Sequence, residues 1–179
     1  EDIDNIRKEY PDLEYHFTEG GPRLYDNYAT DWCKWGLMIS KALKHGCRTF
    51  TGWNLLLDEV GGPNIGPFFC GGLVTRNSLN GELSYSGQYH ALGHFTKYIK
   101  KGAQIFNAET SCKGFGFYAF PNMPKPIDII AANNPDGKFV LVITNPNTSK
   151  QQLQYYRGGQ WWHIEALPNS VSTIVFENN

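Results

Sequence analysis

The hydrophobic positions follow two different patterns, and the change falls near Gly102. Before that point, a short strand candidate at Tyr15–Thr18 leads to a stretch with helical periodicity, and a second strand candidate, rich in Phe and Thr, follows at Cys47–Trp53. The apolar residues between the two strands recur at spacings of three and four, as on one face of a helix: Tyr28, Trp32, Trp35, Ile39 and Leu43. Strand, helix and strand in this order predict a βαβ unit with parallel strands.

The rest of the first region contains a long loop and a second helix. We expect Asp26 or Asn27 to cap the first helix and Gly46 to end it. The stretch 57–86 is rich in Gly and Pro and is predicted to be a functional or disordered loop. A second helical stripe then leads to Gly102, which should stop the helix; its members are Gln88, Leu92, Phe95 and Ile99.

After Gly102 the chain shows short strand patterns with turn signals between them. The predicted strands are Phe115–Phe120, Ile127–Ala132, Phe139–Thr144, Gln152–Tyr156, Trp161–Glu165 and Val171–Phe176. Hairpin turns are expected at Pro135-Asp136-Gly137 and at Gly158-Gly159. This pattern is typical of an antiparallel β-sandwich, so residues 1–102 and 103–179 are predicted to form separate domains.

Two parallel strands do not make a stable sheet by themselves, because both faces and both edges need cover. We therefore expect residues 1–102 to be part of a larger α/β domain, either a (β/α)8 barrel or a doubly wound sheet.

Composition and charge narrow the classes of function that the chain can have. The net charge is −1, which gives no electrostatic footprint for nucleic acid, and no apolar run is long enough to span a membrane. Cys33, Cys47, Cys70 and Cys112 show no metal-binding spacing, and free buried thiols are expected. Asn147-Thr148-Ser149 is an N-glycosylation sequon that arises easily by chance.

Two residues stand where reactive groups collect in α/β proteins, at the carboxyl ends of the parallel strands. Glu19 follows the first strand and precedes Gly20-Gly21, which leaves open space around its carboxylate. That group can attack an electrophilic carbon, act as a base or bind a metal, or it can be an ordinary loop carboxylate. Trp53 follows the second strand and offers either a flat face for a sugar ring or core packing.

Three ordered motifs carry a resemblance to a known family. The first is His16-Phe17-Thr18-Glu19-Gly20-Gly21. The second is Thr51-Gly52-Trp53-Asn54-Leu55-Leu56-Leu57-Asp58, followed by Gly61-Gly62-Pro63-Asn64. The third is Tyr89-His90-Ala91-Leu92-Gly93-His94-Phe95-Thr96-Lys97-Tyr98-Ile99 before Gly102. Together they resemble the last two strands and the final helix of the barrel in glycoside hydrolase family 30, the glucosylceramidase-like retaining β-glycosidases.

The resemblance implies α/β plus β architecture: the last two βα units of a (β/α)8 TIM barrel, followed by an antiparallel β-sandwich. It implies that Glu19 is the nucleophile and that Trp53 lines the subsite of the cleaved sugar. Asn54 and Asn64 are candidates for hydrogen bonds to sugar hydroxyls or for holding the loop, and His16 is a further candidate near the site. The resemblance implies no cofactor or metal, and it implies a secreted, periplasmic or lysosomal location.

The family's acid/base glutamate sits in an Asn-Glu-Pro context that is absent from this sequence. A retaining mechanism needs two carboxyl groups, so we expect the chain alone to be inactive and to need a missing N-terminal barrel segment. Beyond a carbohydrate or glycoconjugate as substrate, the choice among β-glucosides, β-xylosides, β-fucosides and linked glucans stays open. Alternatives are a carbohydrate-binding sandwich and a structural fragment; the aromatic residues of the former would be Tyr155, Tyr156, Trp161 and Trp162.

Overall fold

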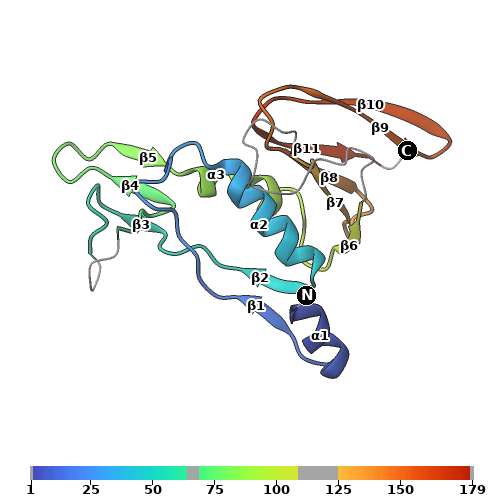
Figure 1. The fold of residues 1–179 in the computed structure, drawn as a ribbon, viewed down its shortest axis with the longest axis horizontal. Helices are drawn as coiled ribbons and strands as arrows, with labels where there is room; N and C mark the ends of the chain where they lie inside the picture. Colours follow the sequence, from blue (N-terminus) through green and yellow to red (C-terminus); the bar gives the residue numbers. More distant parts are fainter. Residues whose placement is uncertain (1, 64–68, 109–124, 178–179) are drawn as a thin grey trace. The chain divides into compact units, whose positions relative to one another are not determined.

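The computed structural model describes residues 2–63, 69–108 and 125–177. The chain divides into two compact units, residues 1–92 and 93–179, and the fold is mixed and rich in β-structure, with three helices in the described part (Figure 1). The third helix spans the division between the units.

The first unit contains the predicted strand–helix–strand sequence. After the short helix α1 (Asp2–Glu9), strand β1 (Tyr15–Phe17) leads to helix α2 (Trp32–Lys44) and strand β2 (Cys47–Phe50). Strands β1 and β2 pair in parallel, as predicted, with an irregularity after Tyr15. The rings of Phe17 and Phe50 stack at 4.3 Å between centroids, which fixes the register at the carboxyl ends of both strands.

Helix α2 begins later than the sequence pattern indicates, and the predicted cap at Asp26 or Asn27 is wrong. The cap residue is Asp31, whose carboxylate accepts a hydrogen bond from the Trp35 indole rather than from a helix amide. Asn27 has a positive φ of 51° and accepts a hydrogen bond from the Thr30 amide, so residues 27–30 form a turn. Gly46, at φ 84°, follows the helix end as expected.

The stretch 57–86 is not a continuous loop. It contains most of a small sheet made of β3 (Leu56–Leu57), β4 (Val74–Arg76) and β5 (Leu83–Tyr85), with β4 in the middle. The turn between β4 and β5 is held by Asn77, whose side-chain oxygen accepts hydrogen bonds from the amides of Leu79 and Asn80. Strands of two or three residues leave little periodicity, which explains why the sequence pattern did not reveal them.

Helix α3 (Gly87–Thr96) confirms the second predicted helix, and Gly102 follows at φ 86° after a turn. The Ser86 hydroxyl accepts a hydrogen bond from the Tyr89 amide and caps the start of this helix.

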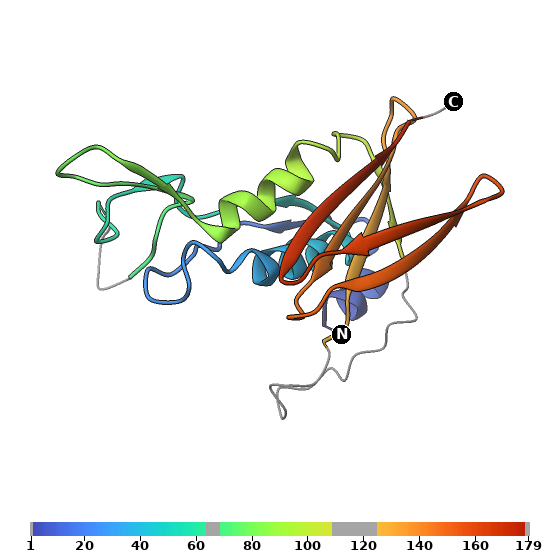
Figure 2. The same cartoon turned by 90° about the horizontal axis from the view of Figure 1, so that it is seen from above.

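The second unit consists of antiparallel strands in two sheets (Figure 2). The order β11-β8-β7-β6 forms the larger sheet and β10-β9 the smaller one. The bounds are β6 (Gln104–Asn107), β7 (Asp128–Asn133), β8 (Phe139–Asn145), β9 (Gln151–Arg157), β10 (Gln160–Ala166) and β11 (Ser170–Phe176). Strands β7 to β11 confirm five predicted strands, β6 was not predicted, and the predicted strand 115–120 lies outside the described residues.

The two sheets share one apolar core. Its buried members come from both sheets and are Ile127, Ala131, Leu141, Ile143, Leu153, Ala166 and Phe176. The turns between the strands are those expected, with positive φ at Gly137, Gly158 and Gly159. The second unit therefore has the sandwich-like packing that the alternating pattern predicted.

Candidate active site

The segments that follow β1 and β2 stay side by side after the strands end. The amide of Thr51 donates to the carbonyl of Phe17 at 2.9 Å, and the amide of Trp53 donates to the carbonyl of Gly20 at 3.0 Å. These bonds continue the parallel pairing by several residues. Glu19 and Trp53, predicted from sequence to stand at the two strand ends, are therefore brought to the same end of the sheet.

Two glycines make this close approach possible. A Cβ atom on Gly21 would lie 1.9 Å from the carbonyl oxygen of Trp53, and one on Gly20 would lie 2.7 Å from the ring of Phe17. Any side chain at Gly21 would push the two segments apart. The Gly-Gly pair after Glu19 therefore has a steric cause in the packing of the two strand ends.

Glu19 lies two residues beyond β1 and is exposed. Its carboxylate has no hydrogen bond or ion pair with any residue that the structure describes. Two carboxylates in the segment after β2 are engaged, by contrast: Asp58 accepts hydrogen bonds from the amides of Val60 and Gly62. Glu59 binds the backbone amide and hydroxyl of Ser78, and these bonds lower the pKa of Glu59. Glu19 thus combines accessibility with a fixed backbone.

Trp53 is 44% exposed, so its ring is not committed to the core. The peptide bond between Trp53 and Asn54 is cis. Asn54 is half-buried, and its carbonyl accepts a hydrogen bond from the amide of Leu73 at 2.8 Å, which ties this segment to the chain just before β4. Asn64, the other asparagine predicted to contact sugar, lies outside the described residues.

His16 is also exposed, and its ring is held by one residue of β2 and one residue just before β1. Its Nδ1 lies 3.0 Å from the Thr49 hydroxyl and its Nε2 lies 3.8 Å from the Glu14 carboxylate. Tyr15 differs from its neighbour, because its hydroxyl is buried without a hydrogen-bond partner among the described residues. The two side chains therefore have different environments, as the alternation along a strand predicts.

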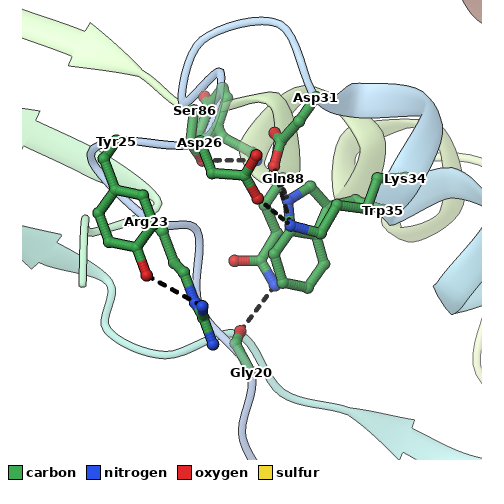
Figure 3. Close-up of polar contacts among 10 residues, drawn as sticks. Gly20, Arg23, Tyr25, Asp26, Asp31, Lys34, Trp35, Ser86 and Gln88 are labelled. Carbon is green, nitrogen blue, oxygen red and sulfur yellow. Dashed lines mark hydrogen bonds and ion pairs between the residues drawn. The ribbon is translucent and has the colours of Figure 1, made fainter. Parts of the chain in front are cut away.

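The structure adds residues that the sequence pattern did not mark as functional. Gln88, at the start of α3, is fully buried and donates from Nε2 to the carbonyl of Gly20 at 2.8 Å (Figure 3). Trp35 of α2 is 3% exposed and donates from its indole to Asp31 at 2.8 Å. Burial raises the pKa of Asp31, and the Trp35 hydrogen bond and the nearby Lys34 partly oppose this. The stripe spacing predicted helical positions for Gln88 and Trp35 but gave no sign of their partners.

The described residues do not form a metal-binding site. The described ranges contain no group of three or more His, Cys, Asp or Glu side chains able to hold a metal ion. Cys33, Cys47 and Cys70 form no disulfide bond with any described residue, and Cys112 lies outside the described residues. No helix in the described part has the length and apolar character needed to cross a bilayer.

Comparison with known proteins shows what this arrangement is similar to. An endo-1,6-β-D-glucanase of Trichoderma harzianum is 25% identical over 97% of the chain and 34% of its own length. A Caenorhabditis elegans protein with a provisional glucosylceramidase name is 32% identical over 49% of the chain and 16% of its own length. The chain thus spans about a third or less of the curated relatives it matches. No family profile matches the chain.

Solved structures of other proteins contain a region with the same fold as this chain. The endo-β1,6-glucanase BT3312 aligns with a TM-score of 0.80 at 22% identity, covering 99% of this chain and 38% of its own. A family 30 xylanase C from Talaromyces cellulolyticus aligns with a TM-score of 0.68 at 18% identity, covering 93% of this chain and 41% of its own. The homologues are glycoside hydrolases, and the resemblance predicted from the three motifs is confirmed.

Proposed function

We propose that this chain, whose homologues are glycoside hydrolases of the family 30 type, is the C-terminal portion of a retaining β-glycosidase with Glu19 as its nucleophile. The observation that carries the proposal is the placement of Glu19. Its exposed carboxylate follows β1, and the hydrogen bond from the Trp53 amide to the Gly20 carbonyl holds that segment against the end of β2. A nucleophile needs both access to substrate and a fixed position.

In this proposal residues 1–102, which include β1, α2 and β2, are the C-terminal part of a (β/α)8 barrel. Residues 103–179 form the attached sandwich domain. The parallel pairing of β1 with β2 supports the barrel, because parallel strands occur in sheets whose faces are covered. The short coverage of the longer relatives supports a missing N-terminal barrel segment.

The reaction is a double displacement. The Glu19 carboxylate attacks the anomeric carbon and forms an ester bond to it while the glycosidic carbon–oxygen bond breaks. The leaving oxygen takes a proton from a second carboxyl group, supplied by the segment that this chain does not contain. Water, deprotonated by that second group, then cleaves the ester and restores Glu19. The two carboxyl groups must lie roughly 5–5.5 Å apart, so the chain alone should be inactive.

The proposed substrate is a β-glucoside-like carbohydrate, because the relatives include endo-1,6-β-D-glucanases. Trp53 offers its exposed ring to the apolar face of the sugar. Asn54, Asn64 and His16 are proposed to contact hydroxyl groups or to support the loop around them. The secreted, periplasmic or lysosomal location remains a prediction.

A fluorosugar tests the nucleophile. A 2-deoxy-2-fluoro-β-glucosyl fluoride should label the full-length enzyme at Glu19, as read by peptide mass spectrometry, and Glu19→Gln should abolish labelling. Glu14→Gln is a matched control, because Glu14 is an exposed glutamate beside the same strand. Labelling at any other carboxylate would refute the assignment. Turnover of an aryl β-glycoside by the 179-residue chain, lost in Glu19→Gln, would refute the need for a second segment.

A second candidate function is carbohydrate binding by the sandwich. Tyr156 and Trp161 are direct cross-strand partners, their ring centroids lie 5.1 Å apart, and they are 57% and 63% exposed. The adjacent cross-strand partners Tyr155 and Trp162 instead contact Phe176, although Trp162 is still 44% exposed. Retention of the chain on a β-glucan affinity gel, lost in Trp161→Ala and kept in Glu19→Gln, would support this function. Passage of the wild-type chain without retardation would exclude it for that glucan.

A further inference from the structure

Three elements of the first unit meet at a single residue, Gly20. The amide of Trp53, after β2, and the side-chain amide of Gln88, on α3, both donate to the Gly20 carbonyl, at 3.0 and 2.8 Å. The ring of Trp35, on α2, lies 3.8 Å from the place where a Gly20 Cβ would stand. Figure 3 shows the Gln88 amide directed at the Gly20 carbonyl beside Trp35. Gly20 directly follows Glu19, so these contacts define the backbone from which the carboxylate projects.

Gln88 is an unusual residue to find in this place. Its side chain has no exposed surface, and burying an amide is unfavourable unless it is hydrogen-bonded. Its Nε2 reaches the Gly20 carbonyl, while its Oε1 is buried without a partner among the described residues. A methionine of similar volume would fill the same space without an unpaired polar atom. Packing alone therefore does not account for a glutamine here.

The orientation of the amide follows from its partner. A carbonyl oxygen only accepts hydrogen bonds, so the Gln88 group that faces Gly20 must be the NH2 end. Gly20 and Gln88 are separated by 68 residues, and the bond links α3 directly to the end of β1. The Gly20 carbonyl then has two donors, which restrict rotation of the Gly20–Gly21 peptide plane, one residue after Glu19.

We propose that Gln88 is a positioning residue for the nucleophile: its amide holds the Gly20 carbonyl and thereby sets the direction of the Glu19 carboxylate. This inference rests on the proposed function of Glu19. It acts through the backbone and requires no contact between Gln88 and substrate. Loss of the bond should slow formation of the glycosyl-enzyme while leaving sugar binding at Trp53 nearly unchanged.

The test measures the rate of fluorosugar labelling at Glu19 in the full-length enzyme. Gln88→Met keeps the volume and removes the donor, and it should slow labelling roughly 10- to 100-fold, the range expected for a misplaced reacting group. KM should change little, since the loss falls on the chemical step. Gln88→Glu gives a signature that packing would not give. Its buried carboxyl donates to the Gly20 carbonyl only when protonated, so labelling should recover toward acid pH relative to Gln88→Met.

Ser86→Ala is the matched control, because it weakens the start of the same helix without touching Gly20. It should label at close to the wild-type rate. Equal labelling rates in Gln88→Met and wild type would overturn the proposal, and so would an equal slowing in Ser86→Ala and Gln88→Met.

Absence of labelling at Glu19 in the wild type would instead refute the proposed function. In that case hydrogen exchange of the Trp53 amide in the 179-residue chain still decides whether Gln88 orders Gly20: Gln88→Met should accelerate that exchange at least about 10-fold, and unchanged exchange would refute it.

Discussion

The two units of this chain use β-structure in opposite ways. In residues 93–179 two antiparallel sheets enclose a core of their own, and the middle strand β8 is buried along most of its length. In residues 1–92 the sheet of β1 and β2 has two strands in the described part of the chain, and all of their residues are half-buried or exposed. The exposed large apolar side chains also concentrate in the first unit, among them Leu55, Val60, Phe69 and Leu79.

This difference distinguishes a unit whose sheets come from one stretch of chain from a unit whose sheet needs strands from elsewhere. An antiparallel sandwich needs only hairpins that fold back on one another, so a single stretch of chain supplies both layers. A parallel sheet needs further strands and covering helices from elsewhere in the sequence. The first unit carries the candidate nucleophile, and the second carries the self-contained core. We therefore expect the two units to respond differently to substitutions.

The largest expected effect is in the core of the second unit. Ile143 lies on β8 and is 1% exposed, so Ile143→Ala should lower the free energy of unfolding of this unit by about 2–5 kcal/mol through lost burial and a cavity. Hydrogen exchange read peptide by peptide should show the loss in β7, β8 and β11. Leu79→Ala is the control, since Leu79 is 93% exposed and its truncation should change stability by less than about 0.5 kcal/mol. An equal loss of protection in β1 and β2 would contradict two independent units.

A smaller effect is expected where the strand ends meet in the first unit. Gly21→Ala places a Cβ against the carbonyl oxygen of Trp53, and the resulting displacement should cost about 1–3 kcal/mol. Exchange of the Trp53 amide, which donates to Gly20, should accelerate more than exchange in α2. The second unit should keep its thermal midpoint. Unchanged Trp53 exchange in Gly21→Ala would mean that the segments after β1 and β2 are not held together in solution.

The same contrast explains what could be predicted from the sequence. Strands of the second unit are six or seven residues long from β7 onward, and their alternation and glycine turns were readable directly. The parallel pair and Glu19 at its end were also predicted, the latter with help from family motifs. The sheet of β3, β4 and β5 was missed, because strands of two or three residues carry almost no periodic signal.

The candidate site shows a different limit. Glu19 and Trp53 were predicted because each stands at the end of a predicted strand, which is a local signal. Gln88 was read only as a helical position, since its partner Gly20 is 68 residues away. The helix cap was predicted at Asp26 or Asn27 instead of Asp31 for a similar reason. The Asp31 carboxylate accepts its hydrogen bond from the Trp35 indole, and the turn at 27–30 is stabilised by contacts that the helical stripe does not reveal.

Asp31 offers a test of the first unit that depends on pH. Burial raises the pKa of this carboxyl in the folded state above its ordinary value, so the folded state favours the protonated form. The stability that the folded protein gains from protonated Asp31 is therefore fully present below the unfolded-state pKa. It is lost as the pH rises through the folded-state pKa. Asp31→Asn keeps an oxygen to accept from the Trp35 indole and removes the charge. Urea unfolding of the variant should show a flatter pH dependence in the first unit and higher stability at neutral pH. A steeper pH dependence in the variant would contradict this sign.

The smallest expected effect is a gain. Gly93 lies inside α3, and a Cβ atom at this position would have no described atom within 4 Å apart from its chain neighbours and the backbone of its own helix. Gly93→Ala should therefore stabilise α3 by about 0.5–1 kcal/mol, because alanine loses less backbone entropy in a helix. Slower exchange of the α3 amides in the 179-residue chain would verify this, and a loss of protection would contradict it. If the N-terminal barrel segment proposed above packs against α3 at Gly93, the longer protein that contains it should be destabilised by a substitution that stabilises the 179-residue chain. A gain in both would place that proposed segment away from this face of α3.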